Sequence, residues 1–307
     1  MLSVKPWQPL AVLQYCAAVI FCICLGGLLS IVLQQLHISG FKEAYDFGNL
    51  LLGTLSFQGV ACLLAPVFLW WHKVSWHDAL GLRDPRLKRV LLLALLVFVI
   101  ALPTVLLLQR ASVFTLTKLG HPPDDQAAVQ IMNNAKSWWV RGYMAGVTIF
   151  LAPLAEEFFF RGLLYPCAKQ FGSSPFLAAC ISFMAALRMV FPLHHAFETM
   201  FPVRHIYGMN WFFAISVCVL FGIGLFYPLL RRLKPASLSV ICVSLLFALI
   251  HGNTAILLPL FVLALILTWL YEMTDNLLAP IAVHALFNAT NLAVMVLIHL
   301  HILPAPK

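Results

Sequence analysis

The sequence predicts an all-α membrane protein, a polytopic bundle of about nine transmembrane helices. Of its 307 residues, 62% are hydrophobic and only 10% are charged, whereas a soluble domain carries about 25% charged residues. Apolar runs of about 20 residues, the length that crosses the hydrocarbon core of a bilayer, recur along the whole chain. A soluble domain of this size could not bury so much apolar surface. A cytosolic enzyme, a disordered protein and a disulfide scaffold are therefore excluded.

Nine apolar runs define the expected spans. They cover about 9–35, 48–71, 90–108, 139–160, 175–193, 210–230, 236–252, 255–272 and 277–300. The first run is too long for the apolar part of a signal peptide, and no small-residue cleavage site follows it, so it is expected to remain as a span. Arg188 and Pro192 interrupt the fifth run, and the count falls to eight if residues 175–193 form a reentrant segment. Residues 109–138 are expected to form an outer loop with a short amphipathic helix.

Positive charges between the runs predict the orientation. The net charge is +8, and basic residues follow the second and sixth spans: Lys73, Arg83, Arg86, Lys88 and Arg89, then Arg231, Arg232 and Lys234. With nine spans, these two loops and Lys5 fall on one side, which the positive-inside rule makes cytoplasmic. We therefore expect a cytoplasmic N-terminus, with loop 72–89 close to anionic lipid headgroups. The basic residues do not form one stripe, so no nucleic acid partner is expected.

Two adjacent glutamates lie in the fourth apolar run. A charge near the bilayer centre costs about 2.5–3.5 kcal/mol and needs a partner, water or a function. Glu157 and Arg161 are four residues apart and can pair along one helix face. Glu156 points about 100° away from Glu157, so it is directed elsewhere. The alternative is an interfacial helix end at which Arg161 reaches the cytoplasm, but it accounts poorly for two glutamates.

Histidines and amides occur in two later runs. His251 closes the seventh run, and His284 and Asn288 lie one turn apart in the ninth, where Asn291 continues the same face. For a lone histidine at a span end, an interfacial position is the commoner role. For the amides, the alternative is hydrogen bonding between helices, above all for Asn291.

A further polar patch surrounds Arg188. It contains His194, His195, Glu198, Arg204 and His205. Its spacing matches no metal-binding template, and a structural role is favoured.

The glutamates, His251 and the pair of His284 and Asn288 could together carry out one reaction. A glutamate, two imidazoles and an amide can deprotonate water, hold an oxyanion and protonate a leaving group. The same donors can also bind a divalent metal. No serine or cysteine lies in a nucleophile elbow, and His-Glu-x-x-His is absent.

Three motifs, in this order on three apolar segments, resemble a known family. They are Glu156-Glu157-x-x-x-Arg161, Phe247-x-x-x-His251 and His284-x-x-x-Asn288. The pattern resembles the CPBP (CAAX protease and bacteriocin-processing) intramembrane proteases, which include the type II CAAX prenyl endopeptidases. The resemblance covers about residues 143–300.

The resemblance implies a glutamate-dependent hydrolase that acts inside the membrane. Glu156 would activate water, aided by His251, and His284 and Asn288 would stabilise the oxyanion. Glu157, Arg161 and Phe247 would be supporting residues, with Arg161 holding Glu157 in place. Family members are usually called metalloproteases, and a zinc ion would be held by Glu156, His251 and His284. A glutamate–histidine mechanism without tightly bound metal has also been argued for relatives, so the cofactor stays open.

The expected function is therefore that of an intramembrane endopeptidase. Its partners would be membrane lipid and a membrane-associated protein or peptide substrate, and the likeness to bacterial members points to a bacterial inner membrane. Two alternatives are a non-catalytic scaffold or immunity protein on the same fold and a proton-coupled transporter. Four intact motif residues weigh against a scaffold, and no inverted repeat supports a transporter.

The expected organisation is an N-terminal transmembrane region, 1–137, followed by a CPBP-like catalytic bundle, 138–307, with an insert at about 167–234. Arg161 and His251 are 251 − 161 = 90 positions apart, where the family usually has a few tens. Two spans in the insert would preserve the sidedness of everything downstream. By the boundaries above, Glu156 lies near the cytoplasmic end of its span and His251 near the outer end of its own. The two would meet only if the boundaries move or a helix breaks, for instance at Pro153.

Overall fold

The computed structural model of the chain describes residues 2–42, 46–120, 137–171, 235–251, 253–299 and 302. All regular structure in these residues is helical, which confirms the all-α prediction. Five of the described helical segments are long and apolar enough to cross a membrane, so the count of nine is not confirmed. These five are Pro9–Gln35, Phe47–Trp71, Leu87–Lys118, Ala255–Thr274 and Leu278–Ile298. The expected spans 175–193 and 210–230, and with them the patch around Arg188, lie outside the described residues.

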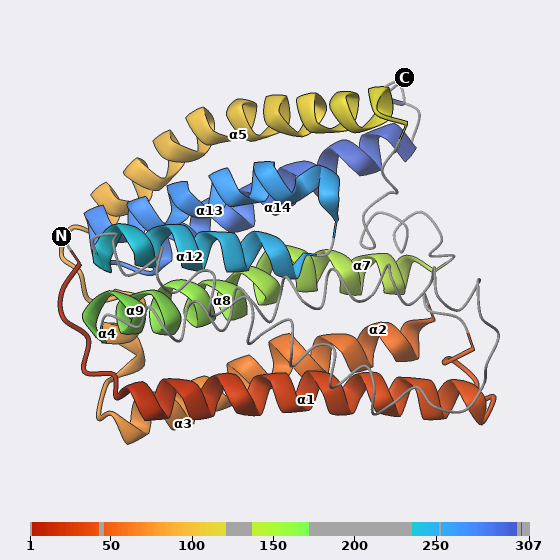
Figure 1. Cartoon of the computed structure of the whole chain (residues 1–307), viewed down its shortest axis with the longest axis horizontal. Coiled ribbons are helices and arrows are strands. Elements are labelled where there is room, and N and C mark those ends of the chain that lie inside the picture. Colours follow the sequence, from red (N-terminus) through yellow and green to blue (C-terminus); the bar gives the residue numbers. More distant parts are fainter. Residues whose placement is uncertain are drawn as a thin grey trace.

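The described helices lie roughly along one direction and form three layers (Figure 1). The first layer holds α1 (Pro9–Gln35), α2 (Phe47–Thr54), the π-helical segment η1 (Leu55–Gly59) and α3 (Val60–Trp71). The middle layer holds α12 (Pro235–Ile250) and a run of α7 (Trp138–Gly146), η2 (Val147–Leu151), α8 (Ala152–Glu157), η3 (Phe158–Leu164) and α9 (Tyr165–Phe171). The third layer holds α5 (Leu87–Lys118), α13 (Thr254–Thr274) and α14 (Leu278–His299). The short helix α4 (Trp76–Leu80) lies between α3 and α5 in the sequence.

Apolar side chains face both the interior and the outside of the bundle. Phe160, Phe247 and Leu163 are fully buried in the interior. On the outer faces, Leu92, Ile100 and many similar side chains are largely exposed. Outward apolar faces on helices of this length are typical of membrane spans, because lipid is their solvent.

The helix that carries the two glutamates is longer than the sequence suggested. The predicted span 139–160 is wrong at its end, because helical structure continues without a break from Trp138 to Phe171. The charged side chains that suggested an end are satisfied inside the bundle, so they do not terminate the helix. The predicted outer loop begins later than residue 109, because α5 continues through Arg110 to Lys118, and residues 121–136 of that loop lie outside the described residues.

This longer helix removes the conflict between the two motifs. Helix α9 ends and α12 begins at the same end of the bundle, and the two helices pack together (Figure 1). Glu156 is 15 residues before Phe171, and His251 is 16 residues after Pro235. At 1.5 Å per residue, they lie roughly 22 and 24 Å from that end. Glu156 and His251 therefore reach the same depth, because α12 is short and stops part-way through the bundle.

The N-terminal segment ties helix ends together at this same end. The Lys5 ammonium contacts Asp275 Oδ1 at 2.6 Å, and the Leu2 N–H donates to Glu272. The indole N–H of Trp7 donates to the Gly162 carbonyl at 2.7 Å. Pro166, four residues after Gly162, has no N–H to donate to that carbonyl, and Trp7 supplies a donor from the N-terminal segment.

Candidate active site

The π-helical segment η2 prepares one wall of the site. The Ala152 N–H donates to the Val147 carbonyl five residues back, and the next residue is Pro153, which has no N–H. The Thr148 carbonyl is thus left without an N–H from residue 152 or 153. Asn288 on α14 fills the gap, because its Nδ2 donates to Thr148 O at 2.9 Å. This contact fixes the orientation of the Asn288 amide and leaves its second N–H and its Oδ1 for other partners.

Glu157 points into the closed interior. Its Oε1 accepts from Arg161 Nη1 at 2.9 Å, which confirms the predicted pair four residues apart. The same oxygen contacts His284 Nδ1 at 2.8 Å. A carboxylate can only accept, so Nδ1 of His284 carries the proton and the ring's Nε2 is left for the other side. Both side chains of the pair are fully buried, and the interfacial alternative for Arg161 is therefore wrong.

The guanidinium of Arg161 is held on several sides. Nη2 donates to the Ala264 carbonyl at 3.2 Å and Nε donates to Thr268 Oγ1 at 3.4 Å. The Phe247 ring lies 4.6 Å from the guanidinium carbon, a cation–π distance. Arg161 therefore joins the glutamate helix to α13 and to the end of α12.

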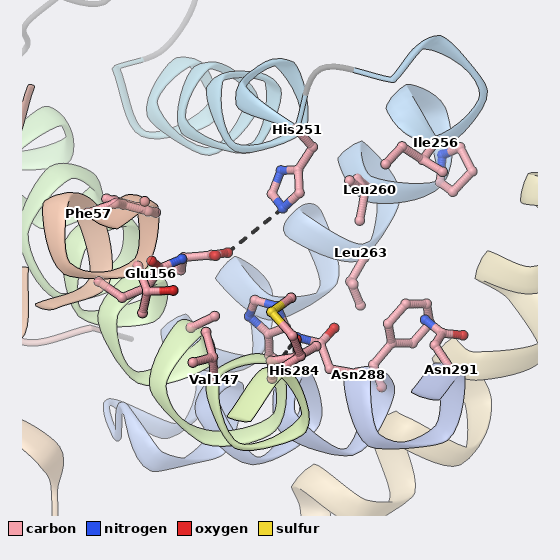
Figure 2. A pocket seen from close by; sticks show the side chains of 18 of the residues that line it. Phe57, Val147, Glu156, His251, Ile256, Leu260, Leu263, His284, Asn288 and Asn291 are labelled. Atoms are coloured by element: carbon pink, nitrogen blue, oxygen red, sulfur yellow. Dashed lines mark hydrogen bonds and ion pairs between the residues drawn. The ribbon is translucent and has the colours of Figure 1, made fainter. Parts of the chain in front are cut away.

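Glu156 points the other way, toward His251 (Figure 2). Its Oε2 lies 3.9 Å from His251 Nε2, which is too long for a hydrogen bond. Among the described residues this buried oxygen has no hydrogen-bond partner. His251 Nδ1 lies 2.7 Å from the Phe247 carbonyl, which makes Nδ1 the donor and turns Nε2 toward the glutamate.

These side chains border one cavity of about 440 Å³. Glu156, His251, His284 and Asn288, the four residues singled out in the sequence, all line it. The residues come from α8, α14 and the end of α12, and Figure 2 shows His284, Asn288 and Asn291 following one another along α14. The volume is within the range of roughly 300–1,000 Å³ that is typical of ligand sites.

The described residues do not form a metal-binding set. No three His, Cys, Asp or Glu side chains in the described part of the chain come close enough together to hold an ion. Glu156, His251 and His284 all line the cavity, but they do not form such a group.

Some lining residues were missed in the sequence. Gln58 on η1, Gln109 on α5 and Thr148 on η2 also line the cavity. Gln58 and Gln109 each interrupt an apolar run, so the rule that singled out Glu156 could have found them. Thr148 could not have been found, because its role depends on a carbonyl that a π-helical segment leaves unpaired.

A comparison with protein families matches the part of the chain that carries these residues. The family model described as type II CAAX prenyl endopeptidase Rce1-like matches residues 137–227 and 219–290. Together these matches span residues 137–290, which is 290 − 137 + 1 = 154 of the 307 residues. The chain belongs to this family. Neither a curated protein nor a solved structure matches it.

Membership has two direct consequences. The Rce1-like family is a family of CAAX-type proteases, so the chain is a membrane-embedded protease by family. Its apolar helices and this membership together make it an integral membrane protein. The scaffold and transporter alternatives are not favoured.

Proposed function

We propose that the chain is an intramembrane endopeptidase in which Glu156 and His251 activate a water molecule. The observation that carries this proposal is the unpartnered Oε2 of Glu156, buried and 3.9 Å from His251 Nε2 in the shared cavity. A buried carboxylate oxygen without a donor is costly unless a ligand or water completes it. A water between these two atoms would be polarised by both.

The proposed reaction transfers one proton from this water to Glu156. The resulting hydroxide attacks the carbonyl carbon of the scissile peptide bond, and the carbonyl oxygen becomes an oxyanion. Glu156 then passes its proton to the leaving nitrogen as the C–N bond breaks, which gives a carboxylic acid and an amine. Atoms and charge balance without any further reactant.

The oxyanion would be held from α14. Asn288 keeps one N–H for it after bonding Thr148, and His284 presents Nε2 on the side away from Glu157. Nε2 can donate only when both ring nitrogens are protonated, and the adjacent Glu157 carboxylate is the counter-charge for that form. Glu157 and Arg161 act in this proposal as positioning residues.

The whole chain has a place in this proposal. Residues 138–307 carry the catalytic side chains, with the insert of about 167–234, and residues 1–137 supply part of the cavity wall. The substrate is a membrane-associated protein or peptide, and a prenyl group is not required. The N-terminus is cytoplasmic, in a bacterial inner membrane.

The test compares protein termini in the membranes of cells that carry the wild type or Glu156→Gln. The substitution keeps the shape of the side chain but removes the base, so fragments made by the wild type should disappear. Equal amounts of both proteins in the membrane provide the control. If all fragments persist with Glu156→Gln, Glu156 is not the base and the mechanism is refuted.

A further inference from the structure

Three carboxamide side chains line the cavity without a part in the proposed reaction. They are Gln58 of η1, Gln109 of α5 and Asn291 of α14, one from each of three different helices. All three helical segments are long and apolar enough to cross a membrane. In the view of Figure 2, Asn291 lies at the end of the cavity away from Glu156.

The side chains of Gln58 and Gln109 have no hydrogen bond to any other described residue. Both are half-buried, and much of the lining beside them is apolar, for example Phe57, Val105 and Leu263. A polar group in such surroundings costs free energy when it lacks a partner. Asn49, a fourth carboxamide in the lining, is by contrast already bonded to the Ser30 hydroxyl at 2.6 Å. The unpartnered amides therefore fit a ligand that offers both donors and acceptors.

An unwound peptide backbone offers these groups. In a membrane, a peptide satisfies its N–H and C=O groups by forming a helix, and it loses these bonds wherever the helix is opened. A carboxamide carries the same donor and acceptor as a peptide group, so it can replace a lost partner on either side. No Lys or Arg is among the described residues that line the cavity, and the apolar side chains around the amides favour an uncharged segment.

We propose that Gln58, Gln109 and Asn291 form a backbone-binding subsite for an extended, uncharged segment of a membrane-embedded substrate. This inference rests on the proposed protease function and adds what the enzyme selects. Binding through peptide groups is insensitive to side-chain identity, so selection depends on how easily a segment unwinds.

The test replaces two of the amides by a side chain of similar length without donors or acceptors. The double variant Gln58→Met, Gln109→Met is compared with the wild type and with Gln14→Met, an exposed glutamine on α1 outside the cavity. The probe is a synthetic peptide with the sequence of a segment whose cleavage in cells depends on Glu156. We expect the double variant to raise KM about tenfold with kcat little changed, because the lost bonds bind ground state and transition state alike.

A second probe separates binding from folding. It is the same peptide with ester bonds in place of the amide bonds that flank the cleaved one, which removes backbone N–H donors. The wild type should bind the ester peptide more weakly than the amide peptide, and the double variant should lose this difference. Thermal unfolding of the double variant should be no easier than that of Gln14→Met, since methionine suits apolar surroundings.

The outcomes distinguish the two proposals. If no fragment depends on Glu156, the protease function fails and the inference falls with it. If Glu156-dependent cleavage occurs but the double variant keeps the wild-type KM and the wild-type preference for amide over ester, the subsite is refuted while the protease function stands.

Discussion

The adjacent carboxylates Glu156 and Glu157 should differ in how much stability the same substitution costs. Glu157→Gln removes the counter-charge of Arg161 and weakens the contact that orients His284. Breaking a buried ion pair from one side costs about 3–5 kcal/mol. Arg161 keeps its bonds to Ala264 and Thr268, and glutamine can still accept one hydrogen bond, so the loss should lie near 3 kcal/mol. That is a large share of a typical unfolding free energy of about 5–15 kcal/mol.

Glu156→Gln is the matched control. Its Oε2 has no hydrogen-bond partner among the described residues, so removing its charge breaks no bond at that atom. We expect the unfolding free energy to change by less than about 1 kcal/mol, while proteolysis is lost. The two substitutions are chemically identical and one residue apart, so the comparison isolates the environment of each carboxylate.

The assay is chemical unfolding of the purified protein in detergent, followed by helix content. A double-mutant cycle with Arg161→Met identifies the source of the loss, because methionine removes the charge that would be left unpaired. The double variant should be more stable than the sum of the two single losses by about 2–3 kcal/mol. If Glu157→Gln costs under about 1 kcal/mol, or if the two losses simply add, the pair does not hold the helices together and the reasoning is refuted.

Three further predictions test two contacts and the orientation in the membrane. Asn288→Ala should lower turnover by roughly 10²- to 10³-fold and also destabilise the protein, because the Thr148 carbonyl loses its donor. The control is Thr290→Ala, since the Thr290 hydroxyl donates to the Leu286 carbonyl of its own helix. Equal turnover in both variants would limit Asn288 to packing. Trp7→Phe should reduce the unfolding free energy by about 1–3 kcal/mol, since the Gly162 carbonyl loses a buried donor. No loss relative to Trp76→Phe would contradict that role. Lys73→Cys, in a background without other cysteines, should react with an impermeant maleimide only from the cytoplasmic side; labelling from outside would reverse the orientation.

Much of the fold could be read from the sequence because lipid imposes simple rules. Seven of the nine expected spans coincide with described helices, since about 20 apolar residues in a bilayer have no stable alternative to a helix. The boundaries were less accurate where polar side chains are satisfied by the interior. Hydropathy ended one span at residue 160, yet Arg161 lies fully buried in a helix that continues to Phe171. A hydropathy scale cannot record that Glu157 and Arg161 neutralise each other.

The candidate site, too, was predictable within one helix and not between helices. Helix periodicity was enough to pair Glu157 with Arg161 and to direct Glu156 elsewhere, because both statements concern one helix. The approach of His251 to Glu156 was not predictable, since it depends on the length of α12 relative to the helix beside it. The contact between Asn288 and Thr148 depends on a π-helical segment, in which the Ala152 N–H bonds the Val147 carbonyl and leaves the Thr148 carbonyl for Asn288.

The two glutamates are not independent, because His284 connects them. Its Nδ1 bonds Glu157 in the closed interior, and its ring also lines the cavity that Glu156 faces. Glu157 therefore determines which nitrogen of His284 the substrate would meet, although Glu157 itself does not line that cavity. It follows that Glu157→Gln should impair catalysis even under conditions where the folded state is fully populated, since the imidazole could then turn or change tautomer. The stability of the buried pair and the chemistry at Glu156 are thus consequences of one arrangement, in which neighbouring residues of a single helix serve opposite sides of it.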